Sequence, residues 1–373
     1  YNLSLIMRWE ILVPGGRMVT SMHDDLLAPE VLADPYPYFA HLRQTDPVHW
    51  NERHEVWVIT RYDDFLWVTR QPAFFSSAVA KRSRRAASAT VEASDHPLHE
   101  EARNVQADHL SQRDGDEHLG LRKVVQAYFS PKALEPWRPY IQASVQELLD
   151  GVQNQGHMDV LRDFAMPLDL RLITEMMALP PADQAELLQL ADKLCALNRG
   201  EADRIRVFME GVQAFKAYLA PFVEARLASP GEDLLSLLVR GEQAGVYTRD
   251  QVLANASVML MAGQETTANL IGNGLLAFLR HPAQWQRLQQ DLSPTPLARA
   301  IDECLRYDAP QKSVERVAVE TVERRGKRIR QGDRVRCFIS AANRDPEAFE
   351  APDTFDITRY PNRHVAFGFG THY

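Results

Sequence analysis

The sequence has few cysteines, no long apolar run near its N-terminus and no excess of basic residues. Cys195, Cys304 and Cys337 are scattered without a C-x-x-C spacing, which argues against a disulfide framework or a zinc site. The apolar runs near the N-terminus are far shorter than the ~18 residues of a membrane span. A net charge of -8 argues against nucleic acid as the main partner, because phosphate binding needs a basic face. We therefore expect a soluble, cytoplasmic protein with no nucleic-acid or membrane partner and no metal ligands in this chain.

The composition is that of a folded enzyme-sized protein. Of its 373 residues, 45% are hydrophobic and 25% charged, so a large core is expected. The chain starts at Tyr1, while Met18 and Met22 are plausible initiation sites. We expect residues 1–21 to be a non-native or disordered extension and residues 22–373 to form one domain. N-terminal sequencing of the native protein would contradict this if it returned Tyr1.

Periodicity along the chain predicts a mainly α fold with small β-sheets. A Pro-rich helix near residue 36 leads into a hairpin over "VHWNERHEVWVIT", and residues 73–113 are expected to be a long polar connection. From about residue 115 to 308 the pattern is helical with Pro and Gly breaks. Its longest helix opens with a capping box, Thr248 and Gln251, and runs about 32 residues to His281. Residues 313–340 predict a second patch of short strands.

The middle of that long helix carries "AGQETT", residues 262–267. Glycine in a helix interior costs about 1 kcal/mol against alanine, so its presence there needs a reason. One interpretation is that Ala262 and Gly263 let a bulky planar ligand approach, while Glu265 and Thr266 supply an acid and a hydroxyl for proton transfer. The alternative is close helix packing with a surface glutamate, and the motif alone does not decide between them.

Two further motifs follow. "ECLR" lies on a helix that we expect to begin with Thr295 as N-cap and Pro296 at its first position. Glu303 and Arg306 share a helix face, and alone they indicate an ordinary exposed pair. The terminal "FGFGTH" is no phosphate loop, because it lacks the G-K-[ST] ending.

Taken together and in this order, the motifs resemble the soluble bacterial type of the cytochrome P450 family. "DGDEHLGLRKVV" is similar to the family's heme-contacting helix, "AGQETT" to its oxygen-activating segment, and "ECLRY" to its E-x-x-R helix. The resemblance covers nearly the whole chain. It implies a triangular prism with a long central helix, and heme b (iron protoporphyrin IX) as the cofactor.

The resemblance also assigns roles to individual residues. His118, Arg122, Arg316 and His372 would bind the heme propionates, since charge-assisted donors suit carboxylates. Ala262, Gly263 and Thr266 would lie over the distal face of heme, and Phe367 and Gly368 against the proximal face. Glu265 and Thr266 would be the catalytic residues that deliver protons. Glu303, Arg306 and Arg359 would form a buried structural triad.

The family pattern ends F-G-x-G-x-H-x-C-x-G, whereas this sequence ends at Tyr373, one residue before that cysteine. No other cysteine substitutes on sequence grounds, because Cys304 lies within E-x-x-R, Cys337 in a strand and Cys195 in a helical stretch. We therefore expect the chain to be a fragment of a monooxygenase that lacks its axial ligand, binds heme weakly and folds marginally.

The resemblance implies a monomeric monooxygenase that oxidises a small organic substrate. Electrons would come from a ferredoxin or flavodoxin and its reductase, with Arg122, Lys123 and Lys132 near the docking face. Basic residues at 81–85 and Arg103 hint at an acidic or carrier-bound substrate. Two alternatives remain open: a heme enzyme driven by peroxide or forming C–C bonds, and a catalytically dead heme-binding or scaffold relative.

Overall fold

The computed structural model describes residues 24–83, 96–198 and 203–373, so the extension expected over residues 1–21 lies outside the described residues. Helices dominate the described ranges. They are α1 (Pro29–Ala33), α2 (Tyr36–Thr45), α3 (Tyr62–Thr69), α4 (Val79–Arg82), α5 (His96–Ala107), α6 (Gly115–Gln126), α7 (Pro131–Leu134), α8 (Arg138–Val152), α9 (Met166–Met176), α10 (Gln184–Leu194), α11 (Arg204–Ala228), α12 (Leu234–Gln243), α13 (Arg249–Arg280), α14 (Pro282–Gln290), α15 (Pro294–Tyr307) and α16 (Ile339–Ala342). The π-helical segment η6 (Val160–Ala165) precedes α9.

The strands form two small sheets. Their bounds are β1 (Val48–Asn51), β2 (Val56–Ile59), β3 (Phe75–Ser76), β4 (Ser313–Ala318), β5 (Val322–Arg324), β6 (Lys327–Ile329) and β7 (Arg334–Phe338). The larger sheet has the order β1-β2-β7-β4-β3, with β2 and β7 parallel, and β5 pairs with β6. The predicted hairpin is confirmed as β1 and β2, and the predicted second patch of short strands as β4 to β7. The late strands β7 and β4 extend the sheet that the early hairpin begins.

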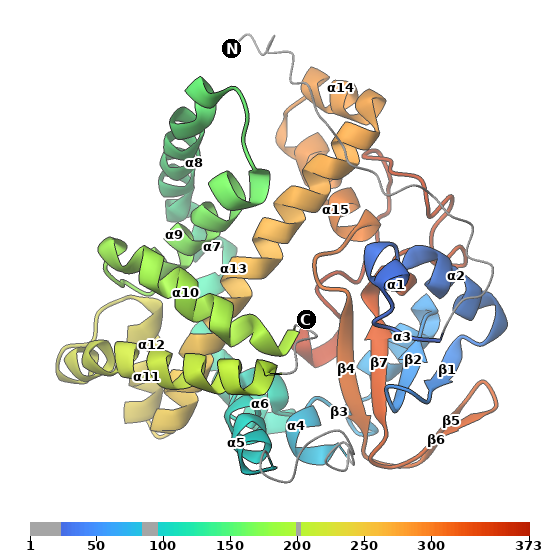
Figure 1. Cartoon of the computed structure of the whole chain (residues 1–373), viewed down its shortest axis with the longest axis horizontal. Coiled ribbons are helices and arrows are strands. Elements are labelled where there is room, and N and C mark those ends of the chain that lie inside the picture. Colours follow the sequence, from blue (N-terminus) through green and yellow to red (C-terminus); the bar gives the residue numbers. More distant parts are fainter. Residues whose placement is uncertain (1–23, 84–95, 199–202) are drawn as a thin grey trace.

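The long helix is confirmed in length and start. It begins after Thr248, whose hydroxyl accepts from the Gln251 amide while the Gln251 side chain accepts from the Thr248 amide. Figure 1 shows α13 running diagonally through the molecule, with α8 to α12 on one side and the five-stranded sheet on the other. This helix packs on α5, on α9 to α12 and on α14 and α15.

Two sequence expectations about local structure are wrong. Residues 73–113 are not a mainly irregular connection, because β3, α4 and α5 fall within them. Helix α5 is stabilised by packing on α11, with Ala102 in the core, and tertiary contacts of this kind do not show in local periodicity. Helix α15 begins at Pro294 after Ser293, not at Thr295, because the earlier of two prolines already fixes the helical φ angle.

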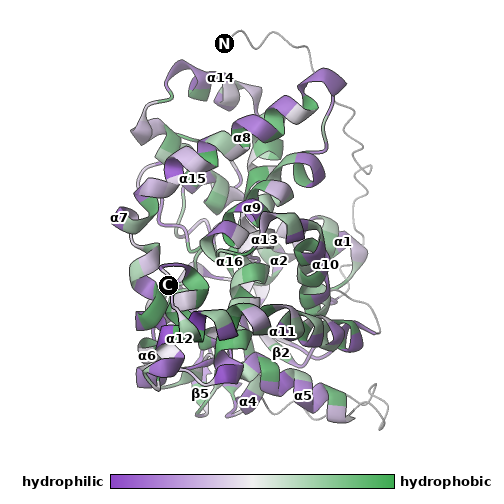
Figure 2. Cartoon of the chain, turned by 90° about the vertical axis from the view of Figure 1, so that its left-hand side faces the viewer, coloured by the Kyte–Doolittle hydropathy of each residue, from purple (hydrophilic) through white to green (hydrophobic). Residues whose placement is uncertain are grey.

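The core includes a large helical cluster and a smaller one beside the sheet. The first involves α9 to α13, and the second joins the sheet to α3 and to the C-terminal loop through Val365 and Ala366. Figure 2 shows hydrophobic and hydrophilic residues alternating along the helices, the pattern of amphipathic helices around a core. Within the described ranges, no helix is both long and apolar enough to cross a bilayer.

Candidate functional site

Four basic side chains from three distant segments meet beside the C-terminal loop. They are His118 and Arg122 of α6, Arg316 of β4 and His372, and we call them the cationic cluster. The rings of His118 and His372 stack with their centroids 4.0 Å apart. Arg122 donates to the carbonyl oxygens of Thr371 at 3.0 Å and Tyr373 at 2.5 Å. The structure therefore brings together all four residues that the resemblance assigns to the propionates.

The cationic cluster holds positive charge that the one nearby carboxylate, Asp114, only partly balances. Arg316 is buried, and no carboxylate in the described residues pairs with it; its Nη1 donates only to the Glu315 carbonyl, at 2.8 Å. Nδ1 of His118 is buried without a hydrogen-bond partner. Burying charge and donors in this way is costly unless an anion satisfies them. Two heme propionates have the charge and the acceptor atoms that these groups lack, so the residues fit that cofactor.

The histidine pKa values also reflect the burial and positive charge of the cationic cluster. Burial, followed by the charges of His118, Arg316 and Arg122, lowers the pKa of His372 to about 4, although nearby Asp114 opposes this. Burial and Arg122 also lower the pKa of His118. Both lowered pKa values favour neutral imidazoles at pH 7, even with Asp114 nearby.

Asp114 is a site residue that the sequence analysis missed. Its carboxylate lies 4.0 Å from Nε2 of His372, accepts from the Ser77 amide at 2.8 Å and makes a short hydrogen bond with the Ser76 hydroxyl. It thereby ties β3 to the start of α6. Its position four residues before His118 was a usable signal, but its partners at 76 and 77 are set by the fold.

The middle of α13 presents an open surface on one side. Ala262 is exposed and Glu265 and Thr266 are half-buried, although the helix runs through the centre of the molecule (Figure 1). The Thr266 hydroxyl donates to the Ala262 carbonyl at 2.8 Å, which leaves its oxygen lone pairs able to accept another hydrogen bond. This stretch is suited to line a ligand site.

Gly263 packs closely on α9. A Cβ atom at this position would lie 3.3 Å from Cβ and Cγ1 of Ile173 in α9. Its missing side chain therefore lets α9 approach α13, as the packing interpretation expects for this residue.

The C-terminal loop combines an exposed ring with two strained-backbone positions. The Phe367 side chain is 60% exposed, whereas Gly368 is buried with φ of 76°. Gly370 has φ of 84°, and a Cβ atom there would lie 2.3 Å from the Thr69 carbonyl oxygen. Only glycine fits these two positions. The loop is thus held on α3 while it presents Phe367 as an apolar surface.

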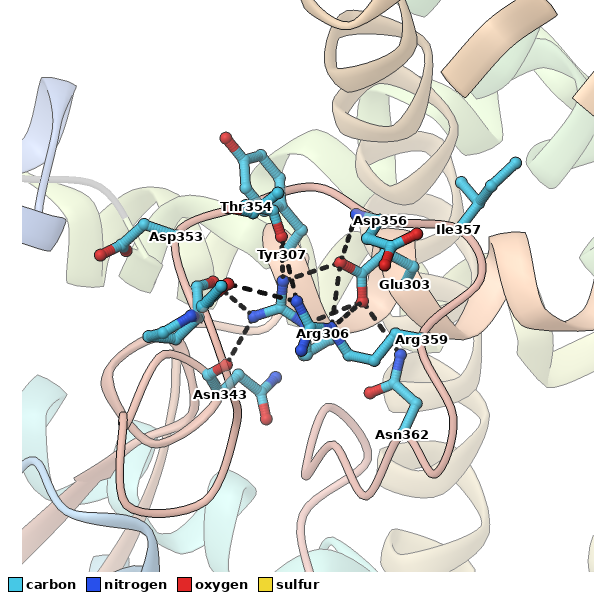
Figure 3. Close-up of polar contacts among 12 residues, drawn as sticks. Glu303, Arg306, Tyr307, Asn343, Asp353, Thr354, Asp356, Ile357, Arg359 and Asn362 are labelled. Carbon is cyan, nitrogen blue, oxygen red and sulfur yellow. Dashed lines mark hydrogen bonds and ion pairs between the residues drawn. The ribbon is translucent and has the colours of Figure 1, made fainter. Parts of the chain in front are cut away.

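The three residues of the expected triad form a buried network behind this loop (Figure 3). Arg306 makes two parallel bonds to the Glu303 carboxylate, both 2.8 Å long, and Nε of Arg359 lies 3.2 Å from the same carboxylate. The Glu303 and Arg306 side chains are fully buried, so the exposed-pair interpretation is wrong. The network also includes acceptors and donors that the sequence did not identify: the carbonyls of Asn343, Pro352 and Thr354, the amide of Asp356 and the side chain of Asn362.

All three cysteines are buried, and Cys304 and Cys337 lie close enough to Glu303 and Arg316, respectively, to be affected by their charges. Burial raises the pKa of both the Cys304 and Cys337 thiols to about 12. Neither is therefore a thiolate at neutral pH.

A small pocket lies where α5, α10, α11 and α13 meet. Its lining is mainly apolar: Val105, Leu194, Leu197, Phe208, Val212, Val258 and Met261, with Gln106, His109 and Ser257. Burial lowers the pKa of His109 to about 4, so its imidazole is neutral at physiological pH. A neutral imidazole in an apolar pocket can both donate and accept one hydrogen bond.

Comparison with known proteins gives a consistent result. A family model described as "Cytochrome P450" matches residues 203–373. The biotin biosynthesis cytochrome P450 of Bacillus subtilis is 32% identical over 349 residues, which is 92% of this chain and 84% of that protein. The cytochrome P450 monooxygenase PikC of Streptomyces venezuelae is 34% identical over 356 residues, covering 93% of this chain and 80% of that protein.

Solved structures of such proteins have the same fold. P450BioI, in complex with acyl carrier protein ligated to hexadec-9Z-enoic acid, superposes with a TM-score of 0.81 at 31% identity, covering 92% of this chain and 86% of that one. CalO2 superposes with a TM-score of 0.83 at 32% identity, covering 95% and 86%.

Proposed function

The chain belongs to the cytochrome P450 family, and from that premise we propose that it is a heme-thiolate monooxygenase that inserts one oxygen atom from O2 into a small, largely apolar substrate. Family members bind heme, and the curated relatives include monooxygenases. The observation that carries the proposal is the only partly balanced cationic cluster, which lies in the same molecule as an open stretch of central helix bearing an acid and a hydroxyl.

The cationic cluster would hold the cofactor through its carboxylates. Arg316 has no carboxylate partner among the described residues, and His118 has an unsatisfied buried nitrogen. Charge-assisted hydrogen bonds from such groups are about twice as strong as neutral ones. Phe367 would supply an apolar contact for the ring system, because its side chain is exposed at the surface of the loop.

Bound heme supplies the chemistry of oxygen activation, with its iron made electron-rich by a thiolate ligand. The chain supplies proton transfer. The Thr266 hydroxyl donates a hydrogen bond to the Ala262 carbonyl. Its oxygen can therefore accept a hydrogen bond from a group on the exposed side of α13. Glu265 precedes it in the same helix and would provide the exchangeable proton.

The thiolate has to come from a cysteine other than the three in this sequence. Cys195, Cys304 and Cys337 are buried, and the pKa values raised at the last two oppose ionisation. We propose that the ligand is a cysteine in polypeptide that continues past Tyr373, as the family pattern implies. A chain extended in this way is the protein to assay.

Electrons would come from a separate ferredoxin or flavodoxin with its reductase. Lys123 and Lys132 are exposed on α6 and α7, close in sequence to the Arg122 that contacts the C-terminal loop. An acidic partner would be steered to such a surface at low salt.

The substrate would enter the apolar pocket beside α13. Its lining suits a hydrocarbon chain or ring, and His109 would hydrogen-bond one polar group of the substrate. Lys81, Arg82 and Arg103 are exposed nearby in α4 and α5, which supports a substrate carrying an acidic or carrier-attached end; Arg84 and Arg85 lie outside the described residues. P450BioI, the structural neighbour bound to acyl carrier protein, is consistent with this option.

The decisive experiment uses the extended chain loaded with heme, its electron donors and a panel of fatty acids with 18O2. Incorporation of one 18O atom supports the proposal, whereas turnover only with peroxide, or none at all, would favour the alternatives.

Arg316→Gln should weaken heme binding about tenfold or more, because it removes a charged hydrogen bond. Arg328→Gln, an exposed arginine of β6, is the matched control and should leave binding unchanged.

A further inference from the structure

A buried carboxyl group lies against the middle of α13, outside the site described above. Asp169, in the first turn of α9, is only 4% exposed, and its Oδ2 atom is buried with no hydrogen-bond partner in the described part of the chain. The backbone amide of Ala268 acts on this carboxyl group as a hydrogen-bond donor and favours its charged form. An acid in such surroundings is costly, so a specific function for it is worth testing.

Two close contacts fix α9 and η6 against α13. They join Ile173 to Gly263 and Leu161 to Gly272. Residue numbers fall along one segment as they rise along the other, so η6 and α9 run antiparallel to α13. Asp169 lies between the two contacts on one side, and Ala268 lies between them on the other. The carboxyl group thus faces the part of α13 that directly follows Glu265 and Thr266.

Among the described residues, no charged side chain balances the Asp169 carboxyl group. Burial is the largest influence on it and raises its pKa to about 7, and the Ala268 amide is the only opposing group. The charged residues of the elements packed around it are engaged elsewhere or exposed. Arg171 pairs with Glu147, Arg162 pairs with Asp163, Glu175 is exposed, and Glu265 is half-buried on α13.

We propose that Asp169 is a positioning residue for Glu265 and Thr266, because its carboxyl group holds the α13 backbone at Ala268. The inference rests on the proposed function, since it concerns the acid and the hydroxyl of that site. Within a regular helix the Ala268 amide would donate to the carbonyl of residue 264. Asp169 offers this amide a second acceptor, which lies outside the helix.

The strength of this second acceptor depends on one proton. The carboxylate is a stronger acceptor than a backbone carbonyl, whereas the protonated acid is weaker and can itself donate. The α13 backbone after Thr266 therefore has two hydrogen-bonding arrangements that differ by the protonation of Asp169. The positions of Glu265 and Thr266, two or three residues earlier, follow this choice.

Amide hydrogen exchange over residues 262–270 tests the backbone contact. We expect Asp169→Leu, which removes both acceptors, to speed exchange there by about three- to tenfold at about pH 8, the factor expected for one lost hydrogen bond. Asp169→Asn keeps an acceptor and should give a smaller change if the leucine variant fails to fold. Glu175→Gln, an exposed carboxyl group on the same helix, is the matched control. Unchanged exchange in both Asp169 variants would overturn the inference.

The heme-loaded extended chain tests the positioning role. We expect Asp169→Asn to lower the fraction of consumed reductant that appears as oxygenated product by about threefold or more, with the pH dependence of this fraction between about pH 6 and pH 8 flattened. Faster exchange with an unchanged product fraction would overturn the positioning role. An inactive wild-type protein would overturn the proposed function and this role with it, a result distinguishable because the exchange measurement needs no heme.

Discussion

At the scale of single residues, the cationic cluster decides what the site can bind. Its members come from α6, β4 and the C-terminal loop, and no single one of them indicates an anion site. Burial together with the neighbouring charges lowers the pKa of the two histidines, as His372 shows. An anionic ligand would oppose this shift, so the cluster is suited to bind a dianion.

The lowered pKa of His372 predicts a specific dependence of stability on pH. Unfolded His372 takes up a proton near pH 6.5, whereas folded His372 does so only near pH 4. Between these values the unfolded state binds more protons, so the free energy of unfolding falls as pH falls from about 6.5 to 4. The expected loss is at most about 3 kcal/mol.

Urea unfolding of the heme-free chain at several pH values measures this effect. His372→Gln should remove most of the pH dependence of the free energy of unfolding between about pH 4 and 6.5. His41→Gln, which replaces an exposed histidine of α2, should leave it unchanged. If this pH dependence is the same in His372→Gln as in the wild type, other groups cause it.

At the scale of elements, α13 is shaped by what packs on it. A side chain at Gly263 would meet Ile173, and one at Gly274 would lie 3.2 Å from the Cys304 sulfur in α15. Small residues let neighbouring helices approach the central helix, and the approach of α9 is what places Asp169 beside Ala268. The glycine cost in helix propensity is offset by this packing.

We predict that Gly263→Val destabilises the fold by about 1–3 kcal/mol, the usual cost of overpacking a core. Adding Ile173→Ala should recover part of this loss, because it removes the side chain that the new methyl groups meet. The control is Gly120→Val in α6, where nothing lies within 4 Å of a new Cβ atom, and its effect should stay within about 0.5 kcal/mol. Denaturant unfolding measures these three variants and Ile173→Ala alone, and additive effects of the two core substitutions would contradict the contact.

At the scale of the whole molecule, the sequence carries a net charge of -8, so an acidic redox partner needs a local basic surface. Lys123 and Lys132 provide exposed positive charge on α6 and α7, and α6 reaches the C-terminal loop through Arg122. We predict that Lys123→Glu with Lys132→Glu slows reduction of the extended, heme-loaded enzyme by a ferredoxin about tenfold at low salt.

The same double variant should weaken the salt dependence of the reduction rate, because steering by exposed charges is screened within about 10 Å at 0.1 M salt. Stopped-flow reduction at several ionic strengths measures both effects. Arg328→Glu, on β6 in the hairpin away from α6 and α7 (Figure 1), should leave the rate and its slope unchanged. An equal loss in that control would mean that net charge, not the proposed docking face, sets the rate.

The sequence by itself determined the features that depend on neighbouring residues. The capping box, the length of α13, the β1–β2 hairpin and the mainly helical character follow from periodicity and turn residues, and the order of three motifs was enough to identify the family. These features act over a few residues along the chain, so they can be recognised before the fold is known.

The tertiary structure alone decided whatever depends on residues far apart in sequence. It joined β7 and β4 to the early hairpin, formed α5 within a stretch that looks irregular, and buried Glu303 and Arg306 completely. It also showed that Gly263 makes room for Ile173, and it placed Asp169 against α13. Burial and the only partly balanced charge of the cationic cluster arise only when distant segments pack together and exclude water, which no local pattern records.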